Sequence, residues 1–168
     1  VVEGVAAGGA VDSERRAVRA RPVSAPDVRP SREPDRPRVP AAFIAALNGS
    51  ALGIGSELAL ACDYRLMAAG DHFIGQPEIL LGFPPGGGGT QRLVRLVGTH
   101  QGLKLMLDGG GLTPEAAAEI GYVDEVVPAD ELVDSAVRLG DRLARRLKFA
   151  VAAVKRAYTL FQERGLRA

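Results

Sequence analysis

The sequence has few of the residues that mark disulfide-rich, membrane-spanning or nucleic-acid-binding proteins. Cys62 is the single cysteine among 168 residues, which excludes an internal disulfide and suits a reducing, cytoplasmic compartment. No run of about eighteen uncharged apolar residues is present, so a membrane helix is not expected. Basic and acidic residues nearly cancel at a net charge of +1, so no overall basic field favours nucleic acid. The opening VVEGVAAGGA has neither an initiator Met nor a basic n-region, so this stretch does not read as a signal peptide, and we expect the chain to be a fragment of a longer protein.

Large apolar side chains are scarce in residues 12–40, DSERRAVRARPVSAPDVRPSREPDRPRVP. Such a composition cannot offset about 1 to 2 kcal/mol of backbone ordering per residue, and repeated proline blocks a long helix. An Arg-rich arm for nucleic acid is the alternative, but acids balance the arginines and no aromatic is available to stack on bases. We therefore expect residues 1–40 to be a poorly ordered Pro/Arg-rich region and residues 41–168 to form the folded core.

Short apolar runs between glycine and proline predict a mixed α/β core. Buried strands are expected over 42–47, 64–69 and 124–127, with strand-like or irregular pieces over 72–75 and 77–82. Helices are expected to begin at three N-caps, Ser56, Thr90 and Thr113. Two further helical stretches are expected between Asp130 and about Gln162.

Most motifs that could carry chemistry fail on their spacing. GIGSEL lacks the third glycine of a dinucleotide loop, and PPGGGGTQR lacks the Lys-Ser/Thr of a phosphate loop. His72 and His100 have no cysteine or carboxylate at ligand spacing, so no metal site is predicted. Ser56 lies outside a G-x-S-x-G elbow, which disfavours a serine nucleophile.

Two glutamates, Glu57 and Glu78, stand at the ends of a segment made largely of glycine and apolar residues. Taken singly, Glu57 is a carboxylate near a helix N-terminus and Glu78 an ordinary loop acid. Taken together, two carboxylates converging in a dry pocket can serve as one acid and one base, orienting a water against a substrate carbon. The helix start at 53–55 could aim free backbone N–H groups at a developing oxyanion.

Three stretches carry a resemblance to a known family: 41-AAFIAALNGSALGIGSELALACDYRLMAA, 75-GQPEILLGFPPGGGGTQRLVRLVG and 113-TPEAAAEIGYVDEVVPADEL. Together they resemble the enoyl-CoA hydratase/isomerase family, also called the crotonase superfamily, over roughly residues 41–156. The resemblance implies an α/β fold with a crotonase-like ββα spiral core, whose N-terminal strands and C-terminal helices are incomplete here. It also implies a role in fatty acid metabolism, an acyl-CoA thioester as substrate, no separate cofactor, and a homo-oligomer that is a trimer or hexamer.

The same resemblance assigns roles to individual residues. Glu57 is implied as the base that orients water for attack at C3 of a 2-enoyl-CoA, and Glu78 as the acid that delivers a proton to C2. Ile54 and Gly9 are implied as the backbone N–H donors of an oxyanion hole. Positions that line the acyl-CoA pocket match three residues, Leu52, Pro77 and Gly86.

The sequence departs from the family pattern at several points. Ile54 stands where glycine is usual, and its β-branched side chain disfavours positive φ. The segment between the two glutamates is one residue longer, around Gly70 or Ile74, and a slip of one residue in a strand reverses side-chain direction. Strands expected before Gly9 are missing. Hydration is therefore the leading prediction, with an isomerase or a catalytically impaired acyl-CoA-binding or assembly homologue as the alternatives.

Overall fold

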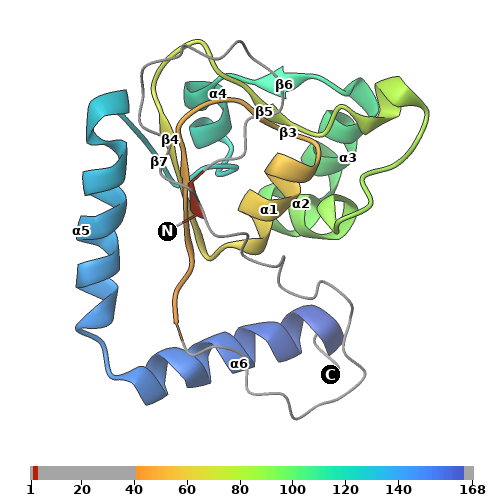
Figure 1. Cartoon of the computed structure of the whole chain (residues 1–168). Helices are drawn as coiled ribbons and strands as arrows, with labels where there is room; N and C mark the ends of the chain where they lie inside the picture. Colours follow the sequence, from red (N-terminus) through yellow and green to blue (C-terminus); the bar gives the residue numbers. More distant parts are fainter. Residues whose placement is uncertain (1, 4–40, 165–168) are drawn as a thin grey trace.

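The computed structural model describes residues 2–3 and 41–164, with side chains described for 41–161. Its strands form two sheets (Figure 1). The larger is wholly parallel, in the order β1 (Val2–Glu3), β2 (Ile44–Leu47), β4 (Tyr64–Ala68) and β7 (Glu125–Val127). The smaller has the order β3 (Ala51–Leu52), β5 (Ile74–Gly75) and β6 (Gly111–Leu112), with β6 antiparallel to β5.

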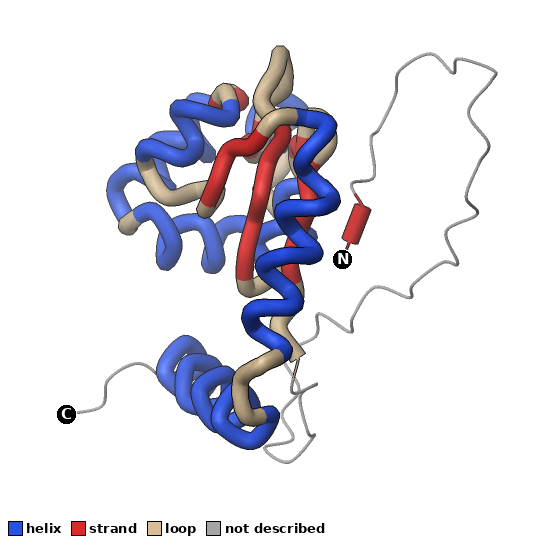
Figure 2. The backbone as a smooth tube through the Cα atoms, turned by 90° about the vertical axis from the view of Figure 1, so that its left-hand side faces the viewer, coloured by secondary structure: helices blue, strands red, loops and turns tan. Residues whose placement is uncertain are grey.

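The helices lie on both sides of the larger sheet (Figures 1 and 2). On one side are α1 (Ile54–Ala61), α2 (Gly89–Val97), α3 (Thr99–Asp108) and α4 (Pro114–Glu119). On the other side is α5 (Leu132–Ala144), and α6 (Lys148–Arg164) follows it at one end of the fold, where Lys155 contacts Ala41 and Asp63. Two 3₁₀ turns complete the elements, η1 (Glu78–Leu81) and η2 (Ala129–Glu131).

Strand β2 shows why the larger sheet is buried on both faces. All four of its residues are buried. Ala45 and Leu47 join the core cluster beneath α1, whereas Ile44 and Ala46 join the cluster beneath α5. Alternate side chains of a strand point to opposite faces, so a continuous apolar run is what a sheet covered on both sides requires.

The predicted mixed α/β order is confirmed, including the strands at 44–47, 64–68 and 125–127. The N-cap prediction at Thr113 is also confirmed, because its side chain accepts a hydrogen bond from the N–H of Ala116. A short strand at Val2–Glu3 pairs with β2, so the expectation that no strand precedes Gly9 is wrong. The remainder of the predicted Pro/Arg-rich region, residues 4–40, lies outside the described residues.

The N-cap predictions at Ser56 and Thr90 are wrong for a shared reason. Helix α1 begins at Ile54 behind Gly53, which has φ 56°, and α2 begins at Gly89 behind Gly88, which has φ 102°. A glycine at positive φ turns the chain into each helix without a capping side chain. Ser56 and Thr90 therefore lie inside their helices.

Helix α3 (Thr99–Asp108) is not among the helices predicted from the sequence. Gly98, with φ 94°, ends α2 and precedes α3. A methyl group on Gly102 would come within 2.8 Å of Cα of Val94. The glycine thus lets the two helices pack closely behind the smaller sheet.

Candidate active site

Glu57 lies in the first turn of α1, and only 4% of it is exposed. Its carboxylate accepts hydrogen bonds from the backbone N–H of Gly87, at 2.8 Å from each oxygen, and of Gly89, at 2.7 Å from Oε1. The Gly89 amide is the first of α2, where N–H groups have no partner within the helix, and the Gly87 amide lies just before the N-cap residue Gly88. Glu57 therefore caps the N-terminus of another helix, a role that a carboxylate performs well.

The glycines of the 86–89 loop are explained by this contact. A methyl group on Gly87 would lie 2.5 Å from Oε2 of Glu57, and one on Gly89 would lie 2.9 Å from Oε1. Neither position has room for a side chain while the carboxylate keeps its place. The glycine-rich loop thus binds the Glu57 carboxylate through its backbone amides and is not a phosphate-binding loop.

Glu78 is the first residue of η1 and is 6% exposed. Its Oε1 faces Gly53, where an added methyl group would lie 3.2 Å away. Its Oε2 is buried and has no hydrogen-bond partner among the described residues. Buried acceptors are nearly always satisfied, so this oxygen is available to a donor on a ligand.

The extra residue between the two glutamates does not turn Glu78 to the surface. Gly70, with φ 142°, lies in the bend between β4 and β5. β5 pairs regularly with β3, so the strand that precedes Glu78 keeps its register. Glu78 consequently enters the same cleft as Glu57.

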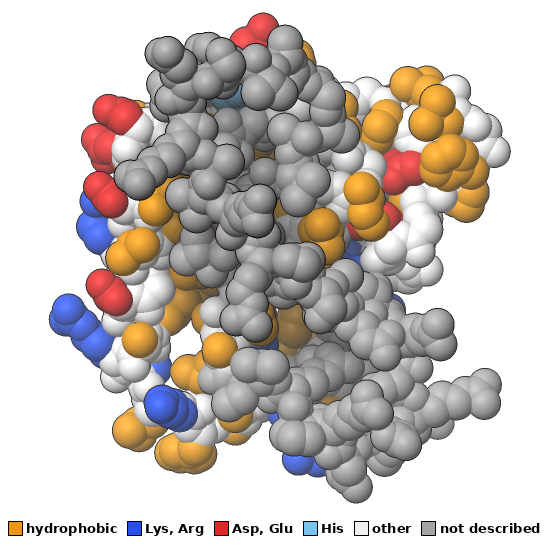
Figure 3. Space-filling model, in the orientation of Figure 1, with side chains coloured by type: hydrophobic (Ala, Val, Ile, Leu, Met, Phe, Trp, Pro, Cys, Tyr) orange, Lys and Arg blue, Asp and Glu red, His pale blue; other side chains and the backbone are white. Residues whose placement is uncertain are grey.

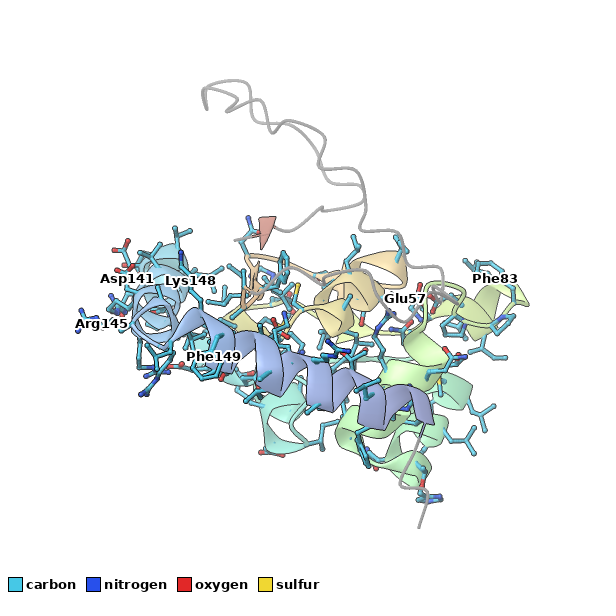
Figure 4. All side chains as sticks on the ribbon, turned by 90° about the horizontal axis from the view of Figure 1, so that it is seen from below. Glu57, Phe83, Asp141, Arg145, Lys148 and Phe149 are labelled. Carbon is cyan, nitrogen blue, oxygen red and sulfur yellow. The ribbon has the colours of Figure 1, made fainter. Side chains whose placement is uncertain are left out.

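That cleft has a volume of about 490 Å³ and a largely apolar wall. Its lining residues are Leu52, Gly53, Ile54, Glu57, Pro77, Glu78, Leu81, Phe83, Pro84, Gly86 and Gly87. Figure 3 shows apolar side chains gathered at the right of the molecule, with acidic side chains between them. Glu57 and Phe83 lie at the same end of the fold, away from the α5–α6 junction (Figure 4). Six predicted site residues thus meet in one cleft, whereas Gly9 lies outside the described residues.

Ile54 is the first residue of α1, so its N–H has no acceptor within the helix. No residue other than glycine has positive φ in the described part of the chain, and the positive φ before α1 falls on Gly53. The predicted conflict between the β-branched side chain and positive φ therefore does not arise. The side chain itself is 65% exposed and stands at the cleft wall.

A buried polar cluster supports the cleft from behind. The hydroxyls of Ser56 and Tyr122 are 2.6 Å apart, and the side-chain amide of Gln76 donates to Ser56 Oγ at 3.1 Å. Burial raises the pKa of the Tyr122 phenol, although the hydrogen bonds with Ser56 and Gln76 act in the opposite direction. Tyr122 is thus a neutral partner at neutral pH. The sequence offered no signal for this cluster, whose members come from distant segments.

Other kinds of site gain no support from the described ranges, 2–3 and 41–164. Within them, no three His, Cys, Asp or Glu side chains come together as ligands for a metal ion. His72 and His100 are partly or fully exposed. No helix in these ranges is long and apolar enough to cross a membrane.

Comparisons with known proteins identify the family and the fold. The family model described as enoyl-CoA hydratase/isomerase matches residues 37–166. The chain is 44% identical over 126 residues to the 2,3-dehydroadipyl-CoA hydratase of Escherichia coli K12, covering 75% of this chain and 49% of that protein. It is 43% identical over 130 residues to a protein of Dictyostelium discoideum named as a mitochondrial enoyl-CoA hydratase, covering 74% of this chain and 46% of that one.

A solved structure shows the same fold. The crystal structure of an enoyl-CoA hydratase from Bacillus anthracis superposes with a TM-score of 0.70 at 39% identity, covering 73% of this chain and 47% of that one. The chain therefore spans about half the length of the curated relatives it matches. Its fold is the crotonase-like α/β fold, and the chain belongs to the enoyl-CoA hydratase/isomerase family.

Proposed function

We propose that this chain carries the catalytic centre of an enoyl-CoA hydratase, which adds water across the C2=C3 bond of a 2-enoyl-CoA thioester. One observation carries the proposal. Two buried glutamates from separate elements line one apolar cleft, Glu57 held by backbone amides and Glu78 with an unpartnered oxygen. Relatives named as hydratases support the same reaction.

In the proposed reaction, Glu57 takes a proton from water while the water oxygen bonds to C3. The electron pair of the double bond moves toward C2, and the thioester oxygen bears the developing negative charge. Glu78 then delivers a proton to C2, so that one water is added in total. Proton exchange with solvent returns the two carboxyl groups to their starting forms. Each general acid or base contributes about 10² to 10⁴ in rate.

The developing oxyanion requires donors. The Ile54 N–H at the start of α1 supplies one in this proposal, and Gly9 supplies the other. A donor of this kind lowers the barrier by about 3 to 4 kcal/mol. Leu52, Pro77 and Gly86 flank the acyl thioester, whose own coenzyme A makes a separate cofactor unnecessary.

Self-association into a trimer or hexamer is part of the proposal. Helix α6 exposes several large apolar side chains, Phe149, Val154, Tyr158 and Phe161. A neighbouring copy that covered these side chains would remove their apolar surface from water. Sedimentation equilibrium checks the proposal, which a monomeric mass at micromolar concentration would contradict. A cytoplasmic location is proposed on the single cysteine alone, and cell fractionation tests it.

The direct test is hydration of crotonyl-CoA, followed by loss of the enoyl thioester absorbance. We expect turnover by the parent chain and a loss of about 10²-fold or more in Glu57→Gln and Glu78→Gln. Glu119→Gln is the matched control, because Glu119 is exposed on α4, outside the cleft. Equal rates in all three variants would refute the assignment.

Two alternatives have distinct outcomes in the same assay. Conversion of a 3-enoyl-CoA into the 2-enoyl isomer without added water would replace the hydratase by an isomerase. Calorimetric binding of an acyl-CoA without any turnover would leave a binding or assembly role.

A further inference from the structure

The loop at residues 86–89, whose backbone amides bind Glu57, has no side chains that could fix its conformation. Residues 86–89 are four consecutive glycines, and Gly88 has φ 102°. Glycine loses more backbone freedom on folding than any other residue, so such a run is easily displaced. The position of the Glu57 carboxylate depends on the amides of Gly87 and Gly89, and therefore on whatever fixes this turn.

Arg92 makes the contact that fixes it. From the first turns of α2, its Nη1 donates to the carbonyl oxygen of Gly87 at 2.7 Å. The guanidinium also lies against Gly88, where an added methyl group would collide with Nη1. Arg92 thus contacts the turn at Gly87 and Gly88 and connects it to α2.

The contact is specific to the backbone of the turn. Among the described side chains, no ion pair joins Arg92 to Glu57 or Glu78. A hydrogen bond from a charged donor is stronger than one from a neutral donor. This bond favours one arrangement of a turn that would otherwise sample several.

We propose that Arg92 is a positioning residue for Glu57, acting by fixing the Gly87–Gly89 turn whose amides hold the carboxylate toward the cleft. Arg92 itself does not line the cleft and touches no reacting atom. The catalytic part of this inference rests on the proposed function, whereas the structural part stands without it.

The test compares Arg92→Met, Arg92→Lys and the control Arg95→Met. Arg95 is exposed one turn further along α2, so its loss alters charge without touching the turn. Amide hydrogen exchange by NMR is the primary measurement. We expect exchange at Gly87 and Gly89 to accelerate about 10-fold or more in Arg92→Met, less in Arg92→Lys, which keeps one donor, and not in Arg95→Met. Thermal unfolding of each variant identifies any global loss of structure, which would accelerate exchange throughout rather than at this turn.

Kinetics with crotonyl-CoA supply the second measurement. A displaced base lowers kcat by about 10- to 100-fold with KM nearly unchanged, and Arg92→Lys restores part of it. Unchanged exchange at both glycines in a folded Arg92→Met, or the same kcat in Arg92→Met and Arg95→Met, overturns the proposal. A parent chain that turns over no substrate refutes the proposed function alone, and the exchange measurement then decides the role of Arg92.

Discussion

The Oε1 atom of Glu57 lies 2.7 Å from the backbone N of Gly89, so a side chain from the first turn of α1 closes the start of α2. The two residues are 32 positions apart in the chain. This hydrogen bond joins the predicted catalytic glutamate to the glycine-rich loop, two features that the sequence presents separately. The orientation of the Glu57 side chain therefore depends on both α1 and the glycine-rich loop.

Replacement of Gly87 by alanine tests that relationship. The new methyl group would lie 2.5 Å from Oε2 of Glu57 and must displace the carboxylate. We expect kcat for crotonyl-CoA to fall about 100-fold in Gly87→Ala, the cost of a misplaced catalytic group. Gly110→Ala is the control, because a methyl group there meets nothing within 4 Å and Gly110 lies outside the cleft. Turnover by Gly87→Ala at the parent rate would show that catalysis does not depend on the contact between Gly87 and Glu57.

Substitution of Ile54 should alter which substrates are accepted. Ile54 and Glu57 are three residues apart on one helix and line the same cleft, so the proposed reaction would place the acyl group beside the isoleucine side chain. We expect Ile54→Ala to raise kcat/KM for 2-methyl-2-butenoyl-CoA relative to crotonyl-CoA by about 10-fold, the lower end of the effect of one methylene in an apolar pocket.

The control for Ile54 is Leu103→Ala, which removes an exposed apolar side chain on α3 outside the cleft. A substrate ratio that is the same in the parent, Ile54→Ala and Leu103→Ala would show that Ile54 does not border the acyl group.

Stability at alkaline pH should depend on Tyr122. Burial raises the pKa of its phenol in the folded chain above the ordinary value of 10.0. As pH rises past about 10, the unfolded chain loses this proton first, so ionisation favours unfolding. The free energy of unfolding should fall by up to about 1.4 kcal/mol per pH unit until the pH passes the pKa of Tyr122 in the folded chain. Below pH 10 both states keep the proton, and this contribution to stability is fully present.

Urea unfolding at a series of pH values measures the effect. Tyr122→Phe should show a smaller loss of unfolding free energy above pH 10 than the parent, whereas Tyr158→Phe, at an exposed tyrosine of α6, should match the parent. The same alkaline slope in the parent and in Tyr122→Phe would contradict the role of Tyr122.

Helix α6 should be held to the core largely through Lys155. Its Nζ lies 2.7 Å from Asp63 Oδ2 and 2.7 Å from the carbonyl oxygen of Ala41, and 4.9 Å from the centre of the Phe43 ring. The pair is partly exposed, so we expect Lys155→Met to lower the unfolding free energy by only about 1 kcal/mol. Lys148→Met, at the exposed start of α6 (Figure 4), is the control. Equal stability of the two variants would show that the contact contributes nothing.

The sequence predicted those features that depend on neighbouring residues. Apolar runs such as 44–47 identified strands because a strand covered on both faces has no other pattern. The family motifs predicted that Glu57 and Glu78 act at one site. The N-cap predictions at Ser56 and Thr90 were wrong because a glycine with positive φ precedes each helix. At α2, the Glu57 carboxylate also accepts the hydrogen bond that a local capping side chain would otherwise accept.

Contacts between distant segments were beyond the reach of the sequence. Ser56 and Tyr122 are 66 residues apart, and neither carries a local signal that the other is its partner. Arg92 reads as an ordinary surface arginine on an amphipathic helix until its contact with Gly87 is seen. Local propensity cannot supply such pairings, because they follow from how the elements pack.

The measurement that tests the central claim most directly is product analysis after incubation of the chain with crotonyl-CoA in isotopically labelled water. Hydration by Glu57 and Glu78 predicts 3-hydroxybutyryl-CoA with the labelled oxygen on C3 and one solvent hydrogen on C2, and no such product in Glu78→Gln. Recovery of unlabelled crotonyl-CoA from the parent chain, or of label only in a free acid released by thioester hydrolysis, would contradict it.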